Sequence, residues 1–337
     1  MEARLLVIQF AQIVFSTLVM FLFMVLITES ALYIFKIKNA RARAIMRAIP
    51  ILKLPLEVLF AHESLLIDFN VLSCSSILRQ WVIPHFITKE QLVCSKLTLC
   101  QYIASQIPST LTFFCTSLLI LFLGISIYRT GQLLYGFYEL KKICRRAEVY
   151  DREITNGKLK QKINAKKVQI LITPDVTVPC AIHSNMIVFP KSAINELLQE
   201  EFETVLAHEL EHLCWYDPLI KFLSLLTSKI FFWIPTSLWL KNLEYEQEHA
   251  SDLSIKRYGL SEISLATAIF KMMKILRKNQ KDKISLLPAC GFMRSQNSSL
   301  KRLQVVLKQN NEIFSLFQYF GVGIIALTAV IIGFKMC

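Results

Sequence analysis

Charged side chains are scarce in this chain of 337 residues. They make up 19% of the residues, whereas hydrophobic residues make up 54%. This balance excludes a pair of ordinary soluble domains and indicates an integral membrane protein. The net charge of +13 could point to nucleic-acid binding. Basic loops beside membrane spans explain it more simply, because Lys and Arg gather on the cytoplasmic flanks of such spans. We therefore expect a lipid bilayer, and no nucleic acid, as a direct partner.

The sequence also lacks the patterns that mark several other classes. Its nine cysteines include no CxxC pair and no zinc-finger spacing. It contains no internal repeat, no base-reading module and no pair of Gly/Pro-broken spans of the kind found in transporters. Cys74, Cys94 and Cys100 share one region between predicted spans. If that region is extracytoplasmic, two of the three could form a disulfide.

Apolar runs divide the chain. Those at 5–28, 104–128 and 313–334 carry no charged side chain, and each exceeds the roughly 20 residues that span a bilayer. Basic clusters follow the first two runs, so both end in the cytoplasm. Because both runs end in the cytoplasm, a segment between them must cross the membrane outward. The weaker run at 45–60 contains prolines and charged residues but is the best available crossing. The alternative is a re-entrant segment at 45–60, with the first span reversed.

This pattern predicts a mostly α-helical membrane protein with about four transmembrane helices. Residues 1–128 would form an N-terminal membrane region with an outside loop at 61–103, and 313–337 a C-terminal transmembrane helix. Residues 129–312 would form a cytoplasmic domain, so both termini lie outside. The apolar segment 218–240 is interrupted by charges and proline. We expect it to form a hairpin or interfacial helices pressed on the membrane, because its longest charge-free piece is too short to span.

Within the cytoplasmic domain, partial alternation predicts strands at 168–173 and 185–189. Pro190 closes the second and suggests an edge strand. Residues 192–213 show helical periodicity. An edge strand could align an extended substrate through Asn185, Ile187 and Phe189 by backbone pairing; a plain structural strand is an equal alternative.

The predicted helix carries His208-Glu209-Leu210-Glu211-His212, an HExxH pattern. Residues four apart lie on one helical face, so both imidazoles can hold one Zn²⁺ ion. Glu209 is then placed to take a proton from water at that ion. The competing interpretation is an acidic surface helix with two unrelated histidines.

A third ligand is needed, and Glu248 in the 248–252 ExxxD spacing is the nearest strong candidate. Asp252 could accept a hydrogen bond from a ligand histidine and hold its tautomer. Glu246 and His249 are rivals for the ligand position. The group that stabilises an oxyanion is left open among four unranked residues: His183, His249, Arg257 and Tyr258.

The segment from Leu206 to Leu219 resembles the HExxH-x4-D-P-L signature of BlaR/MecR-type membrane zinc peptidases, the sensor-transducers of β-lactam resistance and their relatives. Glu248-His-Ala-Ser-Asp252 is similar to the E-x-A-x-D element of that family. Further similar segments follow in the expected order and cover most of the chain.

The resemblance implies an inserted α+β gluzincin-type zinc peptidase domain, facing the cytoplasm of a bacterial inner membrane. One Zn²⁺ per chain would be bound by His208, His212 and Glu248. Glu209 would be catalytic. Asp252 would contact a ligand side chain and not the metal, and Asp217 would be structural or act in the same way as Asp252.

The resemblance also implies cleavage of the chain itself or of a cytoplasmic regulator, such as a repressor, after a signal; a homodimer is left open. The family's β-lactam receptors carry a penicillin-binding domain after the last span. This sequence lacks it, so we expect no direct β-lactam sensing. Two alternatives remain. One is a processing or quality-control peptidase resembling the HtpX and CAAX proteases. The other is a non-catalytic receptor or scaffold, against which the intact Glu209 argues.

Overall fold

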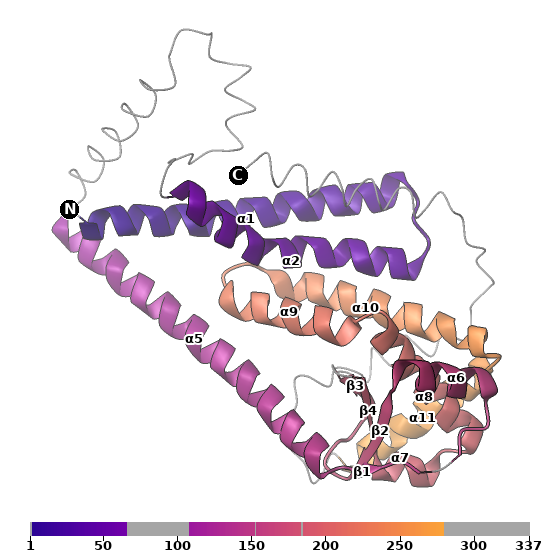
Figure 1. The fold of residues 1–337 in the computed structure, drawn as a ribbon. Coiled ribbons are helices and arrows are strands. Elements are labelled where there is room, and N and C mark those ends of the chain that lie inside the picture. The colour runs from indigo at the N-terminus through magenta and orange to yellow at the C-terminus, as the bar shows by residue number, and fades with distance from the viewer. Residues whose placement is uncertain (1, 66–107, 152, 183–184, 280–337) are drawn as a thin grey trace.

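The computed structural model describes residues 2–65, 108–151, 153–182 and 185–279. Within them, a helical hairpin, one long helix and a compact lobe with a small sheet lie side by side (Figure 1). The predicted span at 313–334, the three cysteines of the predicted outside loop and His183 fall outside the described residues.

The helical hairpin consists of α1 (Glu2–Ile34) and α2 (Ala40–Leu65). α1 is helical over the predicted span 5–28, and its part from Ile13 to Ile34 is long and apolar enough to cross a membrane. α2 continues through Pro50 and Pro55 and packs against α1 on one side and the compact lobe on the other. It does not have the composition of a membrane-crossing helix, so the outward crossing at 45–60 stays a prediction.

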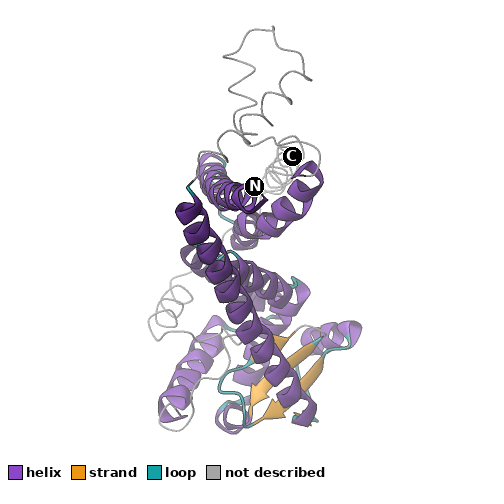
Figure 2. Cartoon of the chain, turned by 90° about the vertical axis from the view of Figure 1, so that its left-hand side faces the viewer, coloured by secondary structure: helices purple, strands orange, loops and turns teal. Residues whose placement is uncertain are grey.

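The long helix α5 (Ser109–Arg146) is the second one that could cross a membrane. Its 38 residues give a length of about 57 Å, well beyond the roughly 30 Å of a hydrocarbon core. Its C-terminal part packs on the sheet, where Leu140 and Cys144 contact Leu171 and Val188. Figure 2 shows α5 running from beside the hairpin down to the strands. One helix therefore combines a stretch that could cross a membrane with a part that packs on the lobe.

The sheet has the order β1-β2-β4-β3. β2 and β4 are parallel, and the two outer pairs are antiparallel. Its strands are β1 (Glu148–Val149), β2 (Gln169–Thr173), β3 (Cys180–Ile182) and β4 (Met186–Pro190). The strands predicted at 168–173 and 185–189 are confirmed as β2 and β4.

The prediction that the 185–189 strand lies at an edge is wrong, because β4 pairs on both sides. Pro190 is the last residue in register, opposite Thr173, so its missing N–H ends the ladder and leaves the interior intact. Ile187, Val188 and Phe189 are fully buried. This continuous apolar run is typical of an interior strand covered on both faces.

The helices of the lobe pack around the sheet and around α8. The predicted helix at 192–213 is divided in two, because Leu197 and Leu198 are extended. Segment 218–240 forms the predicted hairpin, with α9 and α10 joined at 231–235. Leu206 and Leu210 of α8 are fully buried in the largest apolar cluster of the lobe. These helices are α6 (Gly157–Lys166), α7 (Lys191–Glu196), α8 (Gln199–Cys214), α9 (Asp217–Ile230), α10 (Thr236–Ser254), η1 (Ile255–Tyr258) and α11 (Glu262–Asn279).

Candidate metal centre

His208 and His212 lie one turn apart on α8, and Glu248 faces them from α10. The two Nε2 atoms are 3.1 Å apart. Glu248 Oε2 lies 3.5 Å from His208 Nε2, and Oε1 lies 3.6 Å from His212 Nε2. Ligand atoms about 2.0–2.1 Å from a tetrahedral zinc ion are about 3.3 Å from one another. The three side chains therefore converge at about the spacing of such a site, with each oxygen of Glu248 facing a different histidine.

Two carboxylates fix the orientation of both imidazoles. Asp252 Oδ1 lies 2.9 Å from His208 Nδ1, and Asp217 Oδ2 lies 2.8 Å from His212 Nδ1. With the Nδ1 proton directed at a carboxylate, each ring presents the Nε2 lone pair to the same point. Two nitrogen lone pairs and a carboxylate that converge at these distances fit a metal ion.

Glu209 lies beside this group and is 2% exposed. Its Oε2 accepts a hydrogen bond of 2.9 Å from the backbone N–H of Ala181 in β3. Its Oε1 has no hydrogen-bond partner among the described residues. Burial raises the pKa of Glu209 above its usual range, and the nearby histidines offset this only in part. A raised pKa makes this carboxylate a better proton acceptor.

The rival ligands point elsewhere. Glu246 pairs with two arginines of α2: its Oε1 lies 2.7 Å from Arg47 Nη1 and 2.8 Å from Arg43 Nη2. The ring of His249 stacks on Tyr245, with centroids 6.1 Å apart. Neither belongs to the group that could hold an ion. The α10 carboxylate that faces the histidines is Glu248.

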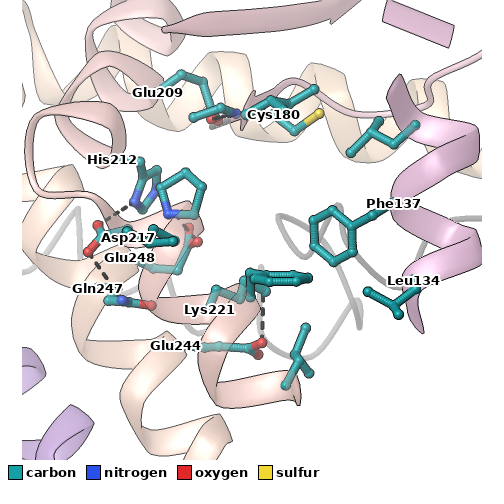
Figure 3. A pocket seen from close by; sticks show the side chains of 17 residues that line it. Leu134, Phe137, Cys180, Glu209, His212, Asp217, Lys221, Glu244, Gln247 and Glu248 are labelled. Carbon is teal, nitrogen blue, oxygen red and sulfur yellow. Dashed lines mark hydrogen bonds and ion pairs between the residues drawn. The ribbon is translucent and has the colours of Figure 1, made fainter. Parts of the chain in front are cut away.

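A cavity of about 330 Å³ opens beside the metal group. Glu209, His212 and Glu248 lie at one side of it, and Phe137 of α5 lies at the other (Figure 3). Most of its wall is apolar, and the Lys221–Glu244 ion pair adds charge away from the histidines. The other lining residues are Leu134, Leu140, Cys180, Ala181, Ile182, Asp217, Pro218, Leu219, Phe222, Leu225 and Gln247.

The residues considered for substrate alignment are not in the wall of this cavity. Ile187 and Phe189 are buried in the core, and Asn185 is exposed ahead of β4 with a φ of 63°. β3 lines the cavity instead. Sequence reasoning missed β3, because three residues are too few to show alternation. The only signal was their place between Pro179 and the next strand.

The remaining oxyanion candidates in the described residues also lie away from the cavity wall. Tyr258 donates its hydroxyl proton to Glu211, at 2.7 Å. Arg257 Nη1 lies 3.8 Å from Glu211 Oε2. Neither they nor His249 line the cavity. The oxyanion-stabilising group stays open.

Two histidines from an HExxH helix, a carboxylate from a second helix and a buried glutamate beside them are the parts of a metallopeptidase site. The same chain has two helices that are long and apolar enough to cross a bilayer. The family model described as BlaR1 peptidase M56 matches residues 51–302, and the chain belongs to this family. Among curated proteins, none matches the chain. The resemblance to the BlaR/MecR-type peptidases is thereby confirmed.

Proposed function

We propose that this chain is a membrane-embedded zinc endopeptidase with His208, His212 and Glu248 as the metal ligands and Glu209 as the general base. One observation supports this function above the others. Oε1 of Glu209, which has no hydrogen-bond partner in the described part of the chain, is buried beside three converging ligand side chains at the wall of a cavity. A non-catalytic scaffold would have no need of a buried carboxylate with one oxygen left without a hydrogen bond, which costs free energy to retain.

The chain's own residues supply proton transfer and positioning. A bound zinc ion would supply Lewis acidity toward water and toward a substrate carbonyl. Glu209 takes the proton of the attacking water at Oε1 and can pass it to the leaving amine. Asp217 and Asp252 keep the two imidazoles in the tautomer and orientation that binding requires. Because Glu209 Oε2 is held by Ala181, its other oxygen is kept in place for the transfer.

The substrate segment is an extended peptide that pairs with the outer edge of β3. Cys180 and Ile182 align with Val188 and Met186 of β4, so the N–H and C=O of Ala181 both face the outer edge. The N–H is held by Glu209, which leaves the carbonyl of Ala181 to accept a hydrogen bond from the substrate backbone. Among the described residues, the outer edge of β3 has no strand partner. A strand edge beside an active site can bind a peptide backbone without selecting its sequence. The apolar wall would then receive side chains of the substrate.

The substrate would be a cytoplasmic regulator, the chain itself, or both. Membership of the BlaR1 peptidase family supports this choice. In that setting, the protein would lie in the inner membrane of a bacterium with its peptidase lobe toward the cytoplasm. Cleavage would transmit a signal across the membrane.

The test is a comparison of the purified wild type with Glu209→Gln. Gln keeps the shape of the side chain and cannot take the proton. We expect peptide hydrolysis to fall by at least about 10²-fold, the usual scale of general-base catalysis. Bound zinc, measured by atomic absorption, should stay at one ion per chain because the three ligands are intact.

Glu200→Gln is the matched control. Glu200 is exposed on the same helix and accepts a hydrogen bond from Ser264, so this change should leave hydrolysis unaltered. Full zinc occupancy together with equal cleavage by wild type and Glu209→Gln would contradict the role of Glu209. Zinc binding without cleavage of any cytoplasmic protein or of the chain itself would favour the scaffold.

A further inference from the structure

Arg41 lies in the first turn of α2, outside the peptidase lobe and upstream of the residues that match the family. Its backbone position is fixed by the helix cap. Asn39 Oδ1 accepts hydrogen bonds from the N–H groups of Arg41, at 2.9 Å, and Ala42, at 3.3 Å. Although an arginine, Arg41 is only 6% exposed. A cation buried this deeply needs specific partners.

All of the partners found for its guanidinium come from the lobe. Nη1 lies between the two oxygens of Asp217, at 2.8 and 2.7 Å. Nη2 donates to Ser251 Oγ at 3.2 Å. The guanidinium also stacks over Trp215, 5.1 Å from the ring centroid. One side chain of the α1–α2 hairpin therefore contacts both the α8–α9 junction and α10.

These partners surround the metal ligands. Asp217 Oδ2 is the atom that accepts from His212 Nδ1, and Ser251 Oγ lies 3.3 Å from the same nitrogen. Ser251 also follows Glu248 by three residues on α10, and Gln247 donates to Asp217 Oδ1 at 3.1 Å. Arg41 therefore binds, at its two nitrogens, the two groups that face the back of His212.

The charges explain why this contact matters. Asp217 is buried, and His212 is neutral when it acts as a metal ligand. Of the groups bonded to this carboxylate, Arg41 is then the one that carries a full positive charge. Without it, a buried anion would keep only neutral donors, and it would turn or draw in water to recover solvation. Either change would release His212 from its orientation.

We infer that Arg41 is a positioning residue of the metal centre, supplied by the α1–α2 hairpin: it holds Asp217, and through Asp217 the ligand His212. This inference rests on the proposed function, since it assumes that the three ligands bind zinc. It makes the geometry of the site depend on where α2 lies. A movement of the α1–α2 hairpin against the lobe would loosen the His212 ligand without touching the metal.

Zinc affinity of the full-length protein in detergent, measured by competition with a chelating dye, tests this directly. Arg41→Met keeps the volume of the side chain and removes the charge. We expect zinc to bind about tenfold more weakly, the lower end of the range for groups behind a ligand. The visible absorption of the Co²⁺-substituted protein should also change, because the orientation of His212 changes.

Two further variants separate positioning from general disturbance of α2. Arg41→Lys should recover part of the affinity, since an ammonium can sit between the Asp217 oxygens but cannot also reach Ser251. Arg43→Met is the matched control: Arg43 pairs with Glu246 and not with Asp217, so zinc affinity should equal that of the wild type.

A double-mutant cycle with Asp217→Asn gives the decisive comparison. If Arg41 acts through Asp217, Arg41→Met should weaken zinc binding no further in the Asp217→Asn background. Should Arg41→Met not fold, as judged by circular dichroism, the same cycle is run with Arg41→Lys.

Additive losses in this cycle, unchanged zinc affinity in Arg41→Met, or an equal loss in Arg43→Met would each overturn the inference. Peptide cleavage is not needed for any of these measurements. A wild type that binds zinc and cleaves no peptide would therefore overturn the proposed enzyme alone. A wild type that binds no zinc would overturn both.

Discussion

Glu246 and Glu248 are two residues apart on α10 and face different neighbours. Glu248 faces the two histidines, whereas Glu246 is buried against Arg43 and Arg47 of α2. Arg47 also pairs with Glu29 of α1, at 3.0 Å. One of these carboxylates thus belongs to the metal group, and the other links α10 to α2, which Arg47 in turn links to α1.

We predict that the two alanine substitutions affect different properties: one removes bound zinc, and the other lowers the folding stability. Glu248→Ala removes a ligand and should abolish stoichiometric zinc, measured by atomic absorption. Glu246→Ala should retain zinc but leave two arginines without their shared carboxylate, which costs on the order of 1–3 kcal/mol of folding free energy. A thermal unfolding curve of the metal-free protein would show the difference. Zinc loss in Glu246→Ala with zinc retained in Glu248→Ala would reverse the assignment.

Spacing along the chain was enough to predict the residues that share one helix with a ligand. His208 and His212 are one turn apart, and Asp252 lies one turn beyond Glu248, so helical geometry brings each pair to one face. Arg41 gave no such signal. It is 176 residues from Asp217, and in the sequence it is one of several cations after an apolar run. Only the packing of α2 on the lobe brings it to the site.

Glu211, the second glutamate of the HExxH motif, lies on a different polar face of α8 from the two histidines. Its side chain is buried, with 1% exposed. It accepts hydrogen bonds from Lys162 of α6 and from Tyr258 of η1. These hydrogen bonds hold the helix that carries both histidines from a face beside the metal group, not from the opposite side.

We predict an acid-dependent loss of stability that originates at Glu211. Burial acts to raise the pKa of Glu211, but the hydrogen bonds from Lys162 and Tyr258 outweigh it and lower the pKa below the ordinary value of 4.5. A carboxylate with a lowered pKa stabilises the fold at pH values above 4.5, and this contribution is lost as pH falls through the folded pKa.

Denaturant unfolding of wild type and Glu211→Gln between pH 3 and pH 7 measures this contribution. The variant should be less stable at pH 7, and the difference should shrink below about pH 4.5. Glu200→Gln, exposed on the same helix, is the control and should follow the wild type. A difference that is constant with pH would show that the titration of Glu211 is not responsible.

The sequence predicted helices and strands correctly where their pattern of residues was long. The prediction failed where the position of a strand depends on which strands it pairs with. β2 and the α9–α10 hairpin follow from alternation and from interrupted hydrophobicity. The interior place of β4 does not, because a terminal proline is compatible with an edge and with an interior strand that ends there. The break between α7 and α8 also gave no signal, since Leu197 and Leu198 continue the apolar stripe.

At the scale of the whole molecule, the basic flanks predict that the lobe faces the cytoplasm. A cysteine introduced at Lys158, exposed on α6, should react with a membrane-impermeant maleimide only after the membrane is opened. One introduced at Ser109, at the start of α5, should react in intact cells. Labelling is measured over the background of the native cysteines. The reverse pattern would overturn the orientation.

Because α5 runs from its apolar stretch to the wall of the cavity, we expect the width of the cavity to depend on the thickness of the bilayer. Phe137 lies 18 residues beyond Leu119, which is at the middle of the apolar part of α5 (109–128), or about 27 Å along the helix. A hydrophobic stretch that is longer than the hydrocarbon thickness of its bilayer tilts, and about 5° of tilt would move a residue about 27 Å along the helix by about 2 Å. We therefore expect cleavage rates in vesicles to change with the acyl-chain length of the lipid, while a detergent-solubilised sample shows one rate. Equal rates in short-chain and long-chain lipid would mean that α5 is held by the sheet alone. Rates that change with acyl-chain length would mean that the bilayer thickness affects the opening through which a peptide reaches Glu209.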